Sequence, residues 1–420
     1  MTLDRRLFLK AGGIALVSLG AGPDFLRRVA RAAPAPAPMA RRRVLVTLFQ
    51  RGAMDGLMAV APVSDPELAR SRPRLAMSAA RGGELLDLGV GFALHPAFEP
   101  WTELWRDGRL AIVHAVGSPD PTRSHFDAQD YMESGTPGRK GTPDGWLNRA
   151  VGLAGHDATP FRAVAMTPAL PRSLYGDEPA VAVTRLEDFA LGGRRLRGVR
   201  GGAVAEAEQD LEALYRQTSE GLLHSAGSDT FEAMATLERL SLGRSRPAAG
   251  ADYPRSPLAE GLRQIAQLIK ADVGLEVAFV ESGGWDTHVA QGTGQGSFAR
   301  SARDLARSVA AFWTDLGSHR DEVVLMTMTE FGRTVAENGT GGTDHGHGSC
   351  LFVLGNGVDG GKVHGRFPKL GKSELYQGRD LPVTTDFRAV FSEVAAAHLG
   401  VAADHRLFPG YAGERLRLFA

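Results

Sequence analysis

The chain has 420 residues, of which 43% are hydrophobic and 23% charged, a composition typical of a globular protein with a full core. Its 48 basic residues balance its 48 acidic residues, so neither a basic nucleic-acid-binding surface nor an acidic tail is indicated. This length allows one large α/β domain or two domains of ordinary size.

The first 32 residues have the order of an export signal. A basic segment at 4–10, with the pair Arg5-Arg6, precedes a small apolar run at 11–21, and residues 30–32 (Ala-Arg-Ala) offer a cleavage point. The segment resembles a twin-arginine signal, with Asp4 where Ser or Thr is commoner. An uncleaved anchor is the alternative, but a bilayer span needs roughly 20 apolar residues. We therefore expect export in the folded state to the periplasm or beyond, with no stable membrane span after cleavage.

A Pro- and Ala-rich linker at 33–42 separates this signal from a single domain expected over 43–420. Five segments are rich in apolar and β-branched residues, as are strands buried on both faces of a parallel sheet: 43–49, 109–116, 275–280, 322–328 and 350–354. Helical patterns lie at about 96–106, at 258–271 and at 298–316. This alternation predicts an α/β fold with a mostly parallel central sheet flanked by helices, and a helical insertion at about 200–250.

Three Gly-rich loops, each just beyond a predicted strand end, carry the side chains best suited to metal binding. They contain Asp286 and His288, then Asp344, His345 and His347, and finally His364. Ligands of doubly wound sheets bind beyond the carboxyl ends of the strands, so we expect these loops to open at one edge. Imidazole and carboxylate groups together predict one or two divalent cations there, with Zn, Mn, Ca and Mg not distinguished.

Each of these residues also has a structural explanation. Asp344 and His345 would then be a turn aspartate and a satisfied histidine, and Asp286 a helix N-cap carboxylate followed by a surface His288. His364 would simply be a loop residue. For His347 we favour support of a ligand or contact with the substrate over direct binding of the metal.

Ser124 is the candidate nucleophile, with Thr122 as second choice. A metal bound to its alkoxide, or His125 taking its proton, would activate Ser124. The competing explanation is a helix cap, because Ser124 and Asp127 have capping-box spacing. The start of that helix would itself offer backbone N–H groups to an anion.

Four further polar residues follow predicted strand ends. Arg333 could clamp an oxyanion while Glu330 holds it in place, or the two could form a structural ion pair, and Arg51 poses the same question. Asp55, in a Gly-flanked loop, is either a metal ligand or a turn former. Cys350 is the only cysteine, so no intrachain disulfide is possible, and it reads as a buried, inert thiol.

Five motifs resemble the family of twin-arginine-exported proteins known as DUF1501, which is distantly related to the alkaline phosphatase and sulfatase superfamily. They are FQRGAMDGL at 49–57, SHFDAQ at 124–129, GWDTH at 284–288, EFGRT at 330–334 and GTDHG at 342–346. The resemblance implies an alkaline-phosphatase/sulfatase-like fold with two metals. One would be held by Asp286, His288 and His364, and the other in part by Asp344 and His345.

Two departures from that superfamily concern the metals. The Asp-x-His spacing at Asp286 is shorter than the superfamily's, and the first strand ends in Gln50 rather than Asp, which leaves Asp55 as a displaced ligand candidate. We expect a secreted metal-dependent hydrolase or transferase acting on a phosphate or sulfate ester, either a small molecule or a cell-envelope component. Ser124 and Arg333 would be catalytic. The alternative is a non-catalytic periplasmic binding or interaction protein on a phosphatase-like scaffold.

Overall fold

The computed structural model describes residues 43–78, 84–156, 159, 161–186, 246–401, 405–413 and 416–419. The expected signal peptide and linker lie outside these residues. So does the helical insertion expected at about 200–250, apart from its last five residues.

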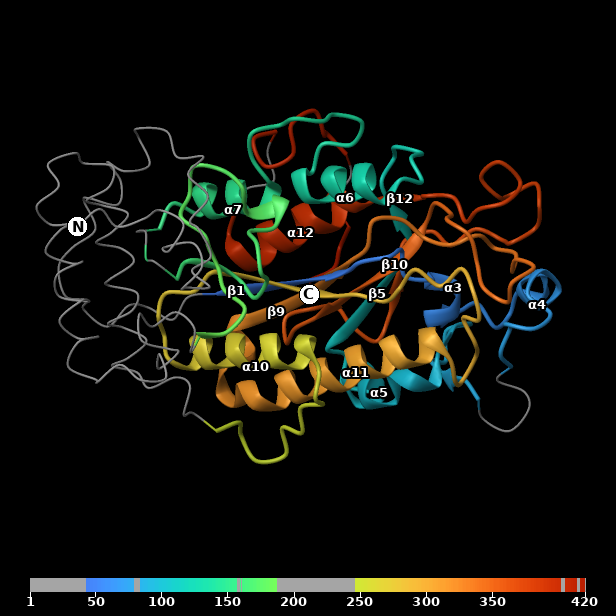
Figure 1. Ribbon diagram of the computed structural model, residues 1–420, viewed down its shortest axis with the longest axis horizontal. Helices are drawn as coiled ribbons and strands as arrows, with labels where there is room; N and C mark the ends of the chain where they lie inside the picture. Colours follow the sequence, from blue (N-terminus) through green and yellow to red (C-terminus); the bar gives the residue numbers. More distant parts are fainter. Residues whose placement is uncertain are drawn as a thin grey trace, which may run out of the picture.

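A nine-stranded sheet forms the centre of the described protein (Figure 1). Its order is β11-β5-β10-β9-β1-β8-β6-β7, and β12 pairs with β5. The strands are β1 (Val44–Gln50), β5 (Leu110–Gly117), β6 (Ala163–Ala165), β7 (Val181–Ala182), β8 (Val277–Ser282), β9 (Val323–Met328), β10 (Ser349–Leu354), β11 (Val363–His364) and β12 (Thr385–Asp386). Only β10 runs against its neighbours in the described sheet, and the other pairings are parallel. The expected mostly parallel sheet is therefore confirmed.

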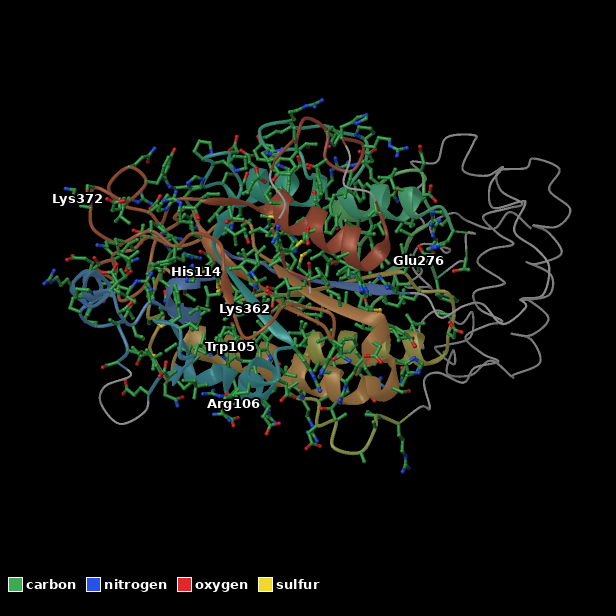
Figure 2. All side chains as sticks on the ribbon, turned by 180° about the vertical axis from the view of Figure 1, so that it is seen from behind. Trp105, Arg106, His114, Glu276, Lys362 and Lys372 are labelled. Carbon is green, nitrogen blue, oxygen red and sulfur yellow. The ribbon has the colours of Figure 1, made fainter. Side chains whose placement is uncertain are left out.

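Helices cover both faces of the sheet (Figure 1). One face carries η1 (Pro96–Trp101), α5 (Thr102–Arg106), α10 (Pro257–Lys270) and α11 (Ser297–Leu316), and the other carries α6 (His125–Ser134), α7 (Trp146–Ala154) and α12 (Phe387–Leu399). Seen from behind, His114 of β5 lies within the molecule, whereas Lys372 lies at its periphery (Figure 2).

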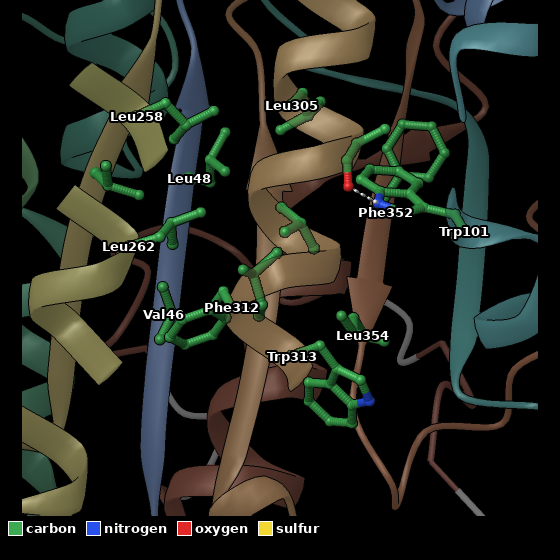
Figure 3. Close-up of a cluster of buried hydrophobic side chains, with 14 of the residues drawn as sticks. Val46, Leu48, Trp101, Leu258, Leu262, Leu305, Phe312, Trp313, Phe352 and Leu354 are labelled. Atoms are coloured by element: carbon green, nitrogen blue, oxygen red, sulfur yellow. Dashed lines mark hydrogen bonds between the residues drawn. The ribbon is translucent and has the colours of Figure 1, made fainter. Parts of the chain in front are cut away.

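Two apolar cores follow from the alternation of side chains along β1. Val46 and Leu48 pack into the core beneath α10 and α11, where Figure 3 shows them beside Leu262 and Phe312. Phe49, one residue further on, belongs to the core beneath α7 and α12. A strand with apolar side chains on both faces must be covered on both sides, which explains the three layers.

Shorter elements fill the edges of the fold. A three-stranded sheet has the order β2-β4-β3. These strands and the remaining short helices are α3 (Gly56–Ala59), β2 (Val60–Ala61), α4 (Pro66–Ser71), β3 (Leu86–Asp87), β4 (Ala93–Leu94), η2 (Arg172–Leu174) and η5 (Gly317–Glu322). In the described part of the chain, no helix is both long and apolar enough to cross a membrane.

All five expected strands and all three expected helical segments are confirmed, with ends that differ by at most two residues. The segment at 96–106 begins as the 3-10 helix η1, because Pro100 inside it lacks the N–H group that an α-helix would use. Cys350 is buried in β10, and burial raises the pKa of its thiol, as expected for an inert cysteine.

The carboxyl ends of β1, β5, β8 and β9 meet at one edge of the sheet, and the reversed strand β10 begins there. The loops with Asp286 and His345 open at this edge, as expected. His364 does not follow a strand end, because it lies within β11 opposite Val113 of β5. Two strands, β5 and β10, separate β11 from β9, a distance of roughly 14 Å at ordinary strand spacing.

Two core histidines make the stability of the fold sensitive to acid. His114 Nε2 donates to the carbonyl oxygen of Val60 (3.0 Å), and His398 Nε2 donates to that of Val44 (2.9 Å). Burial lowers the pKa of each imidazole to about 4. The unfolded chain, with a histidine pKa of about 6.5, therefore binds more protons between these values.

We expect the free energy of unfolding to fall as the pH is lowered from about 6.5 to about 4, by up to about 3 kcal/mol for each of the two histidines. Urea unfolding at several pH values, with a chelator present throughout, measures this slope. In His114→Gln, the number of protons taken up on unfolding, which sets this slope, should fall by about one at a pH between the two pKa values. An unchanged slope in this variant would contradict the assignment of His114.

Candidate metal centre

Three loops at the carboxyl edge bring a histidine, an aspartate and a second histidine together. His125 begins α6 after the loop from β5, Asp286 lies in the loop after β8, and His345 lies just before β10. Each offers one ligand atom, and these three atoms lie within 4.8 Å of one another. A group of this composition can hold a metal ion.

His288 adds a fourth donor to this group. Its Nε2 is 3.1 Å from Asp286 Oδ1 and 2.9 Å from His345 Nε2, and His345 Nε2 is 3.3 Å from the same Asp286 oxygen. Metal bonds of 2.0–2.2 Å place neighbouring ligand atoms roughly 2.9–3.5 Å apart around one ion. The observed separations are therefore those expected of ligands that share a cation.

The three imidazoles all have Nδ1 engaged with an oxygen. His125 donates to Glu330 Oε1 (2.8 Å), His288 to Asp344 Oδ1 (2.9 Å), and His345 to the carbonyl oxygen of Arg123 (2.9 Å). A neutral imidazole protonated at Nδ1 presents a lone pair at Nε2. Three such lone pairs thus face the Asp286 carboxylate, and the same kind of outer hydrogen bond orients ligating histidines in metalloproteins.

The carboxylates around these imidazoles are ionised. Burial acts to raise the pKa of Asp286, but the Arg333 hydrogen bond at 2.6 Å and the neighbouring histidines bring it below its ordinary value. Burial opposes ionisation of Glu330 as well, and hydrogen bonds from His125 and other donors outweigh it to lower the pKa. Hydrogen bonds from Asn338 and then His288 lower the pKa of Asp344. The resulting excess of negative charge favours a cation.

The two histidines of the three-residue group have pKa values shifted in opposite directions. The hydrogen bond to Glu330 raises the pKa of His125, whereas burial lowers the pKa of His345. At a given pH, a larger fraction of His345 than of His125 is therefore neutral when no ion is bound. A protonated His125 must lose its proton before it can bind a metal ion.

The guanidinium of Arg333 is engaged with the protein scaffold. Its side chain is fully buried, and it donates to the carbonyl oxygens of Gly52, Ala53, Trp285 and Thr343 as well as to Asp286 Oδ1. These bonds hold the candidate ligand Asp286 against the loop after β1. This geometry fits a structural role for Arg333. Trp285, whose carbonyl oxygen accepts one of these bonds, is itself buried.

The expected partner of Glu330 was Arg333, but its carboxylate contacts His125. Its Oε1 accepts hydrogen bonds from Gly52 N (2.9 Å), His125 Nδ1 and Gln129 Nε2 (2.8 Å). Arg51 Nη1 in turn donates to Gln129 Oε1 (2.9 Å) and pairs with two glutamates. Arg51 thus belongs to a chain of hydrogen bonds behind the site, not to an exposed anion clamp.

Ser124 occupies the N-cap position of α6, but its side chain makes no cap hydrogen bond. The predicted capping box is therefore not formed. Ser124 is exposed, and its backbone N–H donates to Thr122 Oγ1 (3.2 Å). The neighbouring His125, considered above as the base for Ser124, is one of the three residues whose ligand atoms converge.

Four other candidate residues do not join the ligand atoms: three lie apart, and Asp344 lies behind His288. Asp55 caps α3 and forms a buried ion pair with Arg72 (2.8 Å), so its carboxylate is engaged elsewhere. His364 Nε2 donates to the carbonyl oxygen of Asp359 (2.9 Å). His347 Nε2 donates to the carbonyl oxygen of Ser118 (3.0 Å), and Asp344 supports His288 rather than joining the cluster of ligand atoms.

Two glycines allow the loops at the carboxyl edge to pack closely against one another. Gly52 has a positive φ of 112°, and a Cβ there would lie 2.5 Å from the backbone nitrogen of Asp286. A Cβ at Gly332 would overlap the carbonyl oxygen of Gly348. Only glycine permits these approaches, so both positions are needed for the loops to pack.

A model of the family described as a protein of unknown function (DUF1501) matches residues 95–408. No curated protein matches the chain. Among solved structures, the chain is similar to the structure of PH0037 protein from Pyrococcus horikoshii, with 12% identity over 76% of this chain and 89% of that one. The TM-score of 0.26 is too low for this likeness to support a conclusion about fold or function.

Replacing His125 should remove metal, whereas replacing His364 should not. His125 Nε2 faces Asp286, while His364 lies in the edge strand β11. Mass spectrometric metal analysis of His125→Ala and His364→Ala, both purified without chelator, measures the difference. Equal metal loss in the two variants would contradict the site as described.

Glu330→Gln should weaken metal binding about 10- to 100-fold, because the amide no longer fixes the His125 tautomer. Competition with a chromogenic chelator measures the affinity. Glu337→Gln is the matched control, since Glu337 pairs with Arg74 and contacts none of the described ligands. A similar affinity in both variants would show that Glu330 has no such role.

Proposed function

Because the chain belongs to the DUF1501 family and brings three histidines and an aspartate together, we propose that it is a metal-dependent hydrolase or transferase acting on a phosphate or sulfate ester. The convergence of three Nε2 atoms on Asp286 carries this proposal. The signal-like segment at 1–32 supports export to the periplasm by the twin-arginine route.

The residues present fit a divalent transition metal. Three imidazole nitrogens and one carboxylate favour zinc over calcium, magnesium or manganese, which prefer oxygen ligands. When bound, such an ion polarises an ester oxygen and lowers the pKa of a bound water. Asp286 and His288 have side chains 48% and 37% exposed, so a substrate can reach the ligands from solvent.

Arg123 and Arg379 take the place that the sequence analysis gave to Arg333 as cations for the substrate anion. Both pair with the buried Asp380, which leaves one unit of positive charge in excess within this trio. Arg379 Nη2 also donates to the backbone oxygen of His345. The Arg379 guanidinium therefore lies beside the candidate ligand His345, and the Arg123 guanidinium is joined to it through Asp380; the two side chains are 45% and 27% exposed.

Ser124 remains the candidate acceptor of the transferred group. It is exposed, and it is adjacent in sequence to His125. A free hydroxyl at this point is suited to attack an ester held by the neighbouring imidazoles, whereas a hydroxyl committed to a helix cap would not be. Water is the alternative nucleophile, and the effect of Ser124→Ala separates the two.

A non-catalytic binding protein is the second candidate function. In the described part of the chain, no serine or threonine hydroxyl hydrogen-bonds to an imidazole of the group. The donors of Arg333 are also engaged with the scaffold. A metal held in this way would stabilise the loops and bind a ligand without turnover.

Hydrolysis of aryl phosphate and aryl sulfate esters by the metal-loaded protein tests the proposal. We expect turnover in the wild type and in His364→Ala, and a loss of at least about 100-fold in His345→Ala, because a ligand is removed. Ser124→Ala should cause a comparable loss if Ser124 is the nucleophile. Full metal content with no turnover over a broad panel of esters would favour the binding protein.

A further inference from the structure

A fully buried glutamine connects two of the loops that carry the candidate ligands. Gln291 lies in the loop after β8, which also contains Asp286 and His288. Its side-chain oxygen Oε1 accepts a hydrogen bond from Thr287 Oγ1 in the same loop (2.8 Å). The same oxygen accepts a second hydrogen bond from Thr343 Oγ1, in the loop before β10 (2.8 Å). One oxygen atom thus joins the two loops.

The two threonines lie on the buried side of these loops. Thr287 stands between Asp286 and His288 in the sequence and is buried, whereas those two side chains are 48% and 37% exposed and contact each other (3.1 Å). The backbone N–H of Thr343 donates to the carbonyl oxygen of Thr287 (3.2 Å). On the exposed side, His288 Nδ1 contacts Asp344 Oδ1 (2.9 Å). The loops are therefore joined on both sides.

An aspartate determines which way the Gln291 amide points. Asp55 Oδ2 lies 2.7 Å from Gln291 Nε2, and the same carboxylate forms the buried ion pair with Arg72 (2.8 Å). A carboxylate paired with a guanidinium only accepts hydrogen bonds, so the amide must turn its NH2 group toward Asp55. The hydroxyls of Thr287 and Thr343 can donate or accept, and they are left to donate to Oε1.

We call this connected group the glutamine clasp. Its members are all at most 2% exposed: Arg72, Asp55, Gln291, Thr287 and Thr343. Breaking a hydrogen bond in such a group is costly, because the buried partner left behind cannot turn to water. The clasp therefore fixes the separation of the two loops before any ion binds, which reduces the cost of organising the ligands around one.

We propose that Gln291 is a positioning residue of the candidate metal centre. Through the two threonines it holds Asp286 and His288 at the separations from His345 that one cation requires, namely 3.3 Å from Asp286 Oδ1 and 2.9 Å from His288 Nε2 to His345 Nε2. This inference rests on the proposed function, because it names what sets the geometry of the proposed metal site.

The zinc affinity of the full chain, measured by competition with a chromogenic chelator, tests this role. Gln291→Met removes the side-chain hydrogen bonds of the amide and should weaken zinc binding about 10-fold or more. Thr287→Val removes one hydroxyl at nearly constant size and should weaken it by a smaller factor. Thr287→Ser keeps the hydroxyl and should bind zinc as the wild type does. Adding Thr287→Val to Gln291→Met should cause no further loss, because the acceptor is already absent.

Thr47→Val is the matched control for the loss of a buried hydroxyl. Thr47 Oγ1 donates to the carbonyl oxygen of Ala278 (3.2 Å) in the middle of β1, away from the carboxyl edge. Urea unfolding without metal should show a similar loss of stability in Thr47→Val and Thr287→Val. The zinc affinity should fall only in Thr287→Val.

Wild-type zinc affinity in Gln291→Met, or an equal loss of affinity in Thr287→Val and Thr47→Val, would overturn the inference and leave the proposed metal site in place. Equally weak binding by Thr287→Val and Thr287→Ser would also contradict it, since the hydroxyl would then have no role. If Gln291→Met does not fold, the three threonine variants decide the question. Absence of zinc binding by the wild type would instead remove the proposed function and this inference with it.

Discussion

The guanidinium of Arg333 is the interaction on which the carboxyl edge of the fold depends. It joins the loop after β1 through Gly52 and Ala53, the loop after β8 through Trp285 and Asp286, and the segment before β10 through Thr343. A guanidinium has five N–H donors in a fixed plane, which suits it to join several chain segments at once. Its charge is paired with Asp286, a candidate ligand, so the same contact stabilises the loops and positions the site.

The three histidines of the candidate metal centre are likewise held by hydrogen bonds from other loops. The imidazoles of His125, His288 and His345 are oriented by Glu330, Asp344 and a backbone carbonyl. Two of these three supports are ionised carboxylates, and each sets the tautomer of its histidine. The geometry of the candidate metal centre thus depends on residues that never need to contact an ion, and the close approaches at Gly52 and Gly332 bring them within reach.

The sequence predicts the elements of this fold better than the partners of its polar side chains. Apolar runs and helical periodicity are local, so the main strands and helices can be identified without knowledge of the rest of the chain. Pairing is not local: Glu330 and Arg333 have the spacing of helical neighbours, but this segment is not helical. Glu330 pairs with His125, whereas Arg333 pairs with Asp286. His364 resembles the other loop histidines in sequence, yet it pairs with Val113 in the middle of β5, away from the carboxyl ends of the strands. His125 was recognisable only as part of a motif, because its partner Glu330 is 205 positions away.

This distance along the chain has a consequence for the order of folding and metal capture. His345 is oriented by the backbone of Arg123, 222 positions earlier, and His125 by Glu330, so no short segment contains a complete set of oriented donors. Asp286 and His288 are the only two of the four candidate ligands that lie close together in the sequence, so the unfolded chain offers an ion at most this pair and two distant single ligands. Capture must therefore follow closure of the sheet, and an ion that binds the folded chain alone adds its binding free energy to the stability of the whole fold. Metal release and loosening of the carboxyl edge would then be one coupled event.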